Sequence, residues 1–196
     1  MADCLNHRSP GGDAQRPLER LLSAILEMTG ASLGNVQLMD WHTGRLTIAS
    51  QHGFSKSFLD HFHTVFVRDG SACGRAIRDR RPIIIEDVML DCEFAPHRKI
   101  ADEAGFRAVQ STPLISTSGA FLGVVSTHFS APHRPTAGEM LAVGCAADAE
   151  ANAIIARRAN GPSDPQGWQN ADRKRIANSI ASLVSSYELL RRIEQN

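Results

Sequence analysis

Hydrophobic and polar positions alternate along the chain in two different periods, and the changes of period mark successive elements. From Pro17, large apolar residues recur every three or four positions, which predicts an amphipathic helix that ends near Gly30. Val36 and Leu38 then alternate with polar neighbours, and Leu46 and Ile48 do so again after the turn sequence DWHTG. This pattern predicts a first β-hairpin.

Capping residues place three short helices in the middle of the chain. Ser55 and Ser71 are expected N-caps, the first for a short helix and the second for the segment ACGRAIRDR. A third helix is expected from about His97 to Gly105, since glycine tolerates the positive φ of a helix C-terminus. Between these helices PIIIEDV, at 82–88, predicts a strand buried on both faces, and the segment 87–96 has no period and predicts a loop.

A long second hairpin is predicted around the turn-forming residues Ser116 to Gly119, with arms at 106–115 and 120–129. In the second arm, Ser126 and His128 point to one side while Thr127 points to the other. A strand that only fills a core does not need polar atoms on both sides. We therefore expect this arm to border a functional site, although alternation alone does not say which side the helices cover.

The C-terminal part is expected to be helical. Thr136 and Glu139 fit a capping box before an Ala-rich helix that runs to about Arg158. The expected organisation is a flexible N-terminus (1–15), one folded domain (16–160), a Gly- and Pro-rich linker (161–169) and an amphipathic helix (170–196). In this last helix, apolar residues follow the spacing of a coiled-coil seam, which predicts a homodimer: Ile176, Ile180, Leu183, Tyr187 and Leu190.

Composition excludes several function classes. The 196 residues carry a net charge of +0 without a basic cluster of the kind that binds nucleic acid. No apolar run reaches the ~20 residues of a membrane span, and the N-terminus lacks a signal peptide, so a cytosolic location is expected. The four cysteines are scattered without a CxxC pair, which argues against a zinc site and a disulfide framework.

The order of elements predicts an α+β fold, an antiparallel sheet with helices on both faces. Four segments, GSACG at 70–74, PIIIEDV at 82–88, GFRAVQSTPL at 105–114 and GVVSTHF at 123–129, together resemble the GAF domain. The sequence of these segments is most similar to that of GAF modules of bacterial sensory histidine kinases. The resemblance spans about Leu18 to Arg158 and implies a PAS-like, profilin-type architecture with a small-molecule pocket on one face of the sheet.

This resemblance implies a pocket whose floor is formed by the central strands, and it yields the candidate ligand-binding residues. They are Phe58, Phe62, Cys73, Phe94, His97, Ile100, Ser126 and His128. The implied ligand is a small molecule bound non-covalently, and its identity and any cofactor are unknown. The Cys-His dipeptide of bilin-binding members and the residue pattern of cyclic-nucleotide-binding members are both missing from the sequence.

The resemblance also leaves alternatives. Cys73 falls on one cysteine position of the free methionine sulfoxide reductases, but Cys92 lies too early for their attacking cysteine, so an enzyme is not expected. No metal is expected, because His61, His63, His97 and His128 form no ligand cluster by spacing. The sequence contains no kinase ATP-binding or phosphoacceptor domain, so output must pass through the last helix or a signalling partner such as a histidine kinase. A protein-interaction scaffold without a ligand is the other class that stays open.

Overall fold

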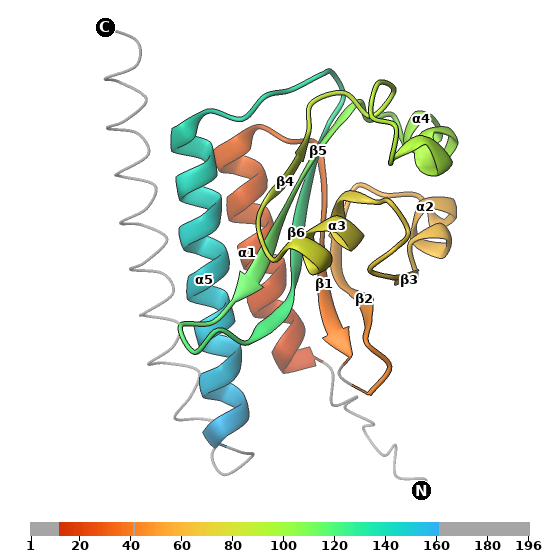
Figure 1. Ribbon diagram of the computed structural model, residues 1–196. Coiled ribbons are helices and arrows are strands. Elements are labelled where there is room, and N and C mark those ends of the chain that lie inside the picture. The colour runs from red at the N-terminus through yellow and green to blue at the C-terminus, as the bar shows by residue number, and fades with distance from the viewer. Residues whose placement is uncertain (1–11, 41, 161–196) are drawn as a thin grey trace, which may run out of the picture.

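A six-stranded antiparallel sheet forms the centre of the molecule (Figure 1). The computed structural model describes residues 12–40 and 42–160. The strand order is β3-β2-β1-β6-β5-β4. The two central strands, β1 and β6, are therefore the first and the last strand among the described residues. The strands are β1 (Leu33–Asp40), β2 (Arg45–His52), β3 (Thr64–Val65), β4 (Ile83–Ile85), β5 (Ala108–Ile115) and β6 (Phe121–Phe129). Both predicted hairpins are present, and the α+β expectation is confirmed.

The helices form two layers, one on each face of this sheet (Figure 1). The long helices α1 (Gly12–Thr29) and α5 (Ala137–Asn160) lie side by side across one face. The opposite face carries the short elements α2 (Lys56–His61), α3 (Ala72–Asp79), the 3-10 helix η1 (Ala95–His97) and α4 (Arg98–Ala104). We call these the helix-covered face and the pocket face.

The helix-covered face is closed by an apolar core. Leu22 and Ile25 of α1, Ala147 of α5, and Leu122 and Val125 of β6 all belong to one cluster of buried side chains. The predicted capping box starts α5: Glu139 Oε2 accepts from the Thr136 N–H at 2.7 Å, and Thr136 Oγ1 accepts from the Glu139 N–H at 3.2 Å. Two donors at the helix end are thereby satisfied by the reciprocal pair.

The short helices of the pocket face begin and end where the sequence predicts. The Ser55 hydroxyl accepts from the Phe58 N–H, and the Ser71 hydroxyl accepts from the Gly74 N–H. Gly105 ends α4 with a φ of 78°, a conformation that favours glycine. These caps fix where Phe58 and Cys73 leave their helices, and both side chains point toward the sheet.

Two elements, α1 and β4, have other bounds than expected. Helix α1 begins at Gly12, inside the segment expected to be flexible, and contains Pro17. Proline has no N–H, so α1 lacks one backbone hydrogen bond at this position. Strand β4 spans only Ile83–Ile85, and Ile84 is half-buried, because β4 is an edge strand that pairs with β5 alone. The expected linker and last helix, 161–196, lie outside the described residues.

Candidate functional site

The contacts of β6 show on which face of the sheet Ser126 and His128 lie. Ser126 and His128 lie on the pocket face, since Ser126 Oγ is 3.3 Å from Cys73 Sγ of α3. The His128 ring makes edge contacts with Phe106 and Phe54, at centroid distances of 4.7 and 4.9 Å. The polar atoms of this side of β6 therefore face the short helices and not α1 or α5.

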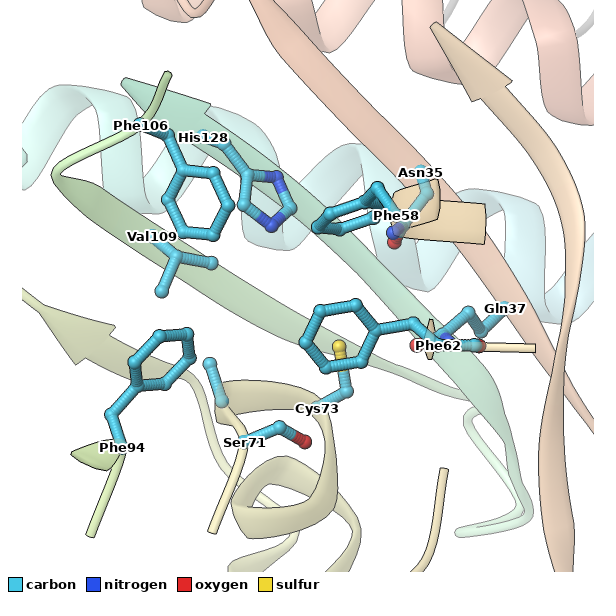
Figure 2. A pocket seen from close by; sticks show the side chains of 11 residues that line it. Asn35, Gln37, Phe58, Phe62, Ser71, Cys73, Phe94, Phe106, Val109 and His128 are labelled. Atoms are coloured by element: carbon cyan, nitrogen blue, oxygen red, sulfur yellow. The ribbon is translucent and has the colours of Figure 1, made fainter. Parts of the chain in front are cut away.

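A small pocket lies between these side chains (Figure 2). Its walls come from β1, α2, α3, β5, β6 and the segments before η1 and β5. The lining residues are Asn35, Gln37, Phe58, Phe62, Ser71, Ala72, Cys73, Phe94, Phe106, Val109 and His128. The space between them is about 10 Å³, roughly what one water molecule requires. A larger molecule can enter only if one of the aromatic side chains moves.

Five of the predicted site residues line this pocket, namely Phe58, Phe62, Cys73, Phe94 and His128. The other three lie around it. Ser126 is fully buried under the floor and hydrogen-bonds to Ser111 at 2.8 Å, and Ile100 is buried in the adjoining apolar cluster. His97 lies behind the lining rings of Phe62 and Phe94, at centroid distances of 5.3 and 5.4 Å.

Six lining residues were missed by the sequence reasoning: Asn35, Gln37, Ser71, Ala72, Phe106 and Val109. Asn35 and Gln37 are the most informative. They alternate with apolar Val36 and Leu38, a pattern that was used only to predict a hairpin strand. In the register of β1 and β6, Asn35 lies opposite Ser126, so it shares the face of the predicted site. A buried polar face on β1 was the signal available in the sequence.

The polar groups of the pocket are uncharged. Burial lowers the pKa of His128 to about 3, although a hydrogen bond to the Leu33 backbone opposes this effect. Burial also raises the pKa of the Cys73 thiol, against the opposing hydrogen bonds with Ser126 and Ser111. Near neutral pH the imidazole is therefore neutral and the thiol protonated. A protonated thiol is a poor nucleophile.

Within residues 12–40 and 42–160, three atoms of the pocket side chains find no hydrogen-bond partner. They are Asn35 Oδ1, Gln37 Oε1 and His128 Nδ1. All three residues are deeply buried, with exposed fractions of 2%, 0% and 4%. Buried polar groups in folded proteins are nearly always paired, because an unpaired group loses its hydration without compensation. Three polar side chains with unpaired atoms thus line one small space, where a bound molecule could hydrogen-bond to them.

A chain of hydrogen bonds joins the segments that cover the pocket. His97 Nε2 is 2.6 Å from the Asp69 carbonyl oxygen, which can only accept, so this nitrogen carries the proton. In the neutral ring His97 Nδ1 is then an acceptor, and His61 Nε2, 3.0 Å away, donates to it. We call this chain, His61–His97–Asp69, the histidine clasp. It ties α2 to η1 and to the loop before α3.

Ion pairs hold the loop that carries Phe94. The buried Arg75 of α3 donates to both carboxylate oxygens of Asp91, at 3.0 and 3.1 Å, and Arg98 donates to the Asp91 carbonyl at 3.0 Å. Gly70 passes so close to this loop that a Cβ there would collide with the Glu93 carbonyl. The covering segments are thus fixed to one another as well as to the sheet.

Two further kinds of feature are absent from residues 12–40 and 42–160. Among them, no group of three or more His, Cys, Asp or Glu side chains is arranged to hold a metal ion. None of the helices in this part of the chain combines the length and the apolar character needed to cross a bilayer.

The fold and pocket together define a class of protein, an α+β domain with an antiparallel sheet and a small pocket under short helices. The sequence matches the GAF domain family over residues 13–154, and the chain belongs to this family. GAF domains are sensory modules found in histidine kinases and other signalling proteins. A search of curated proteins found no match.

Solved structures with the same fold include proteins of different kinds. A GAF domain from a phosphoenolpyruvate-protein phosphotransferase of Coxiella burnetii has a TM-score of 0.66 and 19% identity, covering 76% of this chain and 87% of its own. A domain of a protein described as a two-component sensor histidine kinase, from Sinorhizobium meliloti 1021, has a TM-score of 0.60 and 20% identity, covering 74% and 93%.

A third solved structure of this kind belongs to an enzyme. The free methionine-R-sulfoxide reductase of Neisseria meningitidis, solved with its substrate, has a TM-score of 0.58 and 19% identity, covering 73% of this chain and 81% of its own. At these identities the likeness shows the fold alone.

Proposed function

We propose that this chain is a regulatory GAF domain that binds a small molecule non-covalently in the pocket between the sheet and the short helices. The observation that carries the proposal is the set of unpaired buried atoms on Asn35, Gln37 and His128. Ligand pockets are mostly apolar with a few placed polar groups, and here Phe rings surround these three. A ligand that hydrogen-bonds to these three atoms offsets the free energy that their burial costs.

Strand β6 provides a route from this pocket to the long helices. Ser126 and His128 face the pocket, while Leu122 and Val125 pack in the core under α1 and α5. Since packed cores shift between discrete arrangements and do not deform smoothly, a ligand that moves β6 changes how α1 and α5 pack. We propose that terminal helices carry the signal to a partner protein.

Native mass spectrometry of the full chain, purified without denaturation, tests the proposal. We expect a mass excess that disappears when the same sample is denatured. If native and denatured masses agree, and no metabolite from a broad collection raises the melting temperature, the pocket binds no small molecule.

In that case the second candidate function, a scaffold that only presents its helices, gains support. The small space of about 10 Å³ between the lining residues favours this candidate, since close-packed side chains leave little room for a ligand.

Dimerisation belongs to the same proposal and rests on the spacing of apolar residues in the C-terminal segment. We expect light scattering to give a dimer mass for the full chain and a monomer mass for a version that ends at Asn160. Leu183→Glu is the point test, because a charge in the seam costs more than an exposed one. If this variant stays dimeric, the segment is not the dimer seam.

Methionine sulfoxide reduction is the enzymatic alternative, and the buried protonated thiol of Cys73 argues against it. Cys92 and Cys145 are exposed and lie away from the lining of the pocket. The full chain incubated with free methionine sulfoxide and dithiothreitol is expected to give no methionine. Turnover that is lost in Cys73→Ser or Cys92→Ser would reassign the domain as an enzyme.

A further inference from the structure

The histidine clasp is tied to one wall of the pocket through Phe62. The Phe62 ring lines the pocket (Figure 2), and its centroid is 4.7 Å from that of the His61 ring and 5.3 Å from that of the His97 ring. The Phe62 carbonyl oxygen accepts from Gln37 Nε2 on the pocket floor at 3.5 Å, which is long for a hydrogen bond. Opening of the clasp therefore frees an aromatic wall that a larger molecule has to displace.

The geometry of the clasp limits how many protons it can hold. In the neutral clasp His97 Nε2 donates to the Asp69 carbonyl oxygen at 2.6 Å, and His97 Nδ1 accepts from His61 Nε2 at 3.0 Å. When the pair gains one proton, one of the two facing nitrogens still has a lone pair, so the contact between the rings survives.

A second added proton has a different effect. Both facing nitrogens, His61 Nε2 and His97 Nδ1, then carry N–H groups and no acceptor remains between them. Two cations also lie in contact, and like charges at this separation repel. The clasp therefore holds with no added proton or with one, and it opens with two.

The groups around the clasp decide at which pH the second proton binds. Burial, and then the neighbouring His97, lower the pKa of His61, while the carboxylates of Asp69 and of Glu103 on α4 oppose this and raise it. The lowering effects are the larger ones. Further charged side chains of α2, α4 and the adjoining loop are exposed or bonded to other groups, and they include Lys56, Asp60, His63, Arg68, Arg98 and Lys99.

We infer that the histidine clasp is an acid-sensitive latch, in which double protonation of the His61–His97 pair releases Phe62 and opens the pocket. This inference rests on the proposed function, because it regulates access to that same pocket. Released imidazoles titrate near pH 6.5, whereas the closed clasp binds its second proton only at lower pH. The open form therefore gains protons first as the pH falls. The closed cover is favoured above about pH 6.5 and becomes less favoured toward pH 5.

Hydrogen exchange of the full chain without added ligand, measured between pH 7 and pH 5, tests the latch. Each rate is divided by the intrinsic rate at the same pH, so that only opening is compared. The N–H groups of Phe62 and His97 report on the cover, since they donate to the Phe58 and Phe94 carbonyls at 3.0 and 2.9 Å. A helix as short as α2 keeps such bonds only while it is packed. We expect opening of the cover to increase about ten-fold toward pH 5, while β5 and β6 stay more protected.

His61→Gln is the variant that keeps the contact but does not titrate. Its amide offers an N–H to neutral His97 or an oxygen to protonated His97, so the cover should stay closed and the ten-fold increase should disappear. His128 is present in variant and wild type, so its own pH dependence cancels in the comparison. His63→Gln, at an exposed position nearby, is the matched control and should keep the wild-type increase.

A second variant shifts the pH of opening and leaves both clasp rings in place. Glu103→Gln removes an exposed carboxylate that raises the pKa of His61. The second proton should then bind less readily, and the increase in exchange should move to lower pH.

Each outcome decides the inference. Exchange of the cover that does not change with pH, an increase that persists in His61→Gln, or an increase shared equally by β5 and β6 overturns the latch. Loss of the increase in His63→Gln also overturns it, because the effect would then not come from the clasp. The wild-type series requires no variant to fold. Native mass spectrometry judges the proposed function separately, since the cover can open with acid in a chain that carries no small molecule, and a bound molecule can coexist with a cover that ignores pH.

Discussion

The two faces of the central sheet are both buried, yet they are filled in different ways. On the helix-covered face, Leu114 and Leu122 pack against α1 and α5 with almost no exposed surface. On the pocket face, His128, Asn35 and Gln37 are as deeply buried, but each has an atom without a partner. Gln110 Oε1 and Thr127 Oγ1 of the helix-covered face are also buried without a partner among the described residues. The difference between the faces is that the unpaired atoms of the pocket face belong to residues that line one common pocket. This difference supports the proposal that a ligand binds on the pocket face.

The largest expected effect comes from the helix-covered face. Leu114 is fully buried, so Leu114→Ala leaves a cavity under the helices and should lower the free energy of unfolding by about 3 kcal/mol. Urea denaturation of variant and wild type measures this loss. The change in stability of this variant between pH 7 and pH 5, which His128 of the pocket face controls, should match that of the wild type, and a different pH dependence would contradict the separation of the two faces.

Which features of the fold and the pocket the sequence predicts depends on how far apart along the chain the interacting residues lie. The caps at Ser55, Ser71 and Thr136 are local, and the structure has all three where the sequence predicts them. Period and turn residues likewise located both hairpins. These features depend on residues a few positions apart, which a single sequence contains in full.

The pocket depends on contacts between distant segments, and here prediction was partial. Alternation put Ser126 and His128 on one side without saying which, because the side is decided by where α1 and α5 pack. Asn35 and Gln37 were missed, since polar residues on a predicted hairpin usually face solvent. They are buried only because β6 pairs with β1 and the Phe62 segment covers them.

A pH titration gives the second largest effect and probes the pocket face. The pKa of His128 is lowered to about 3 in the folded protein, so the imidazole stays neutral there while the unfolded chain binds a proton below about pH 6.5. The unfolded state therefore gains protons first as pH falls. Stability is complete above pH 6.5 and decreases toward pH 3, with a loss of about 2 kcal/mol from this group by pH 5.

Urea denaturation between pH 7 and pH 5 measures this slope. Asp87 and Asp91 have lowered pKa values and contribute below this window, whereas burial raises the pKa of Asp148, which gives a change of the opposite sign. His61 adds a change of the same sign, since burial lowers its pKa too. His128→Gln should flatten the slope, whereas His63→Gln, at an exposed site, should keep it. Equal slopes in both variants would show that His128 is not the responsible group.

The smallest expected effect concerns the histidine clasp, and it separates the cover of the pocket from its floor. His97→Leu keeps an apolar side chain against Phe62 and Phe94 but removes both hydrogen bonds of the ring. We expect a loss of about 1 kcal/mol in the free energy of unfolding, the usual net value for such bonds. Local opening should change more than global stability, since the clasp joins short elements at the surface. Hydrogen exchange should therefore speed up at residues 56–62 and 94–98 while β5 and β6 stay protected.

Lys56→Ala, which removes an exposed ion pair of the same helix, is the matched control and should leave these rates unchanged. Faster exchange throughout β5 and β6 in His97→Leu would mean that cover and floor unfold together, and that the pocket cannot open without loss of the sheet.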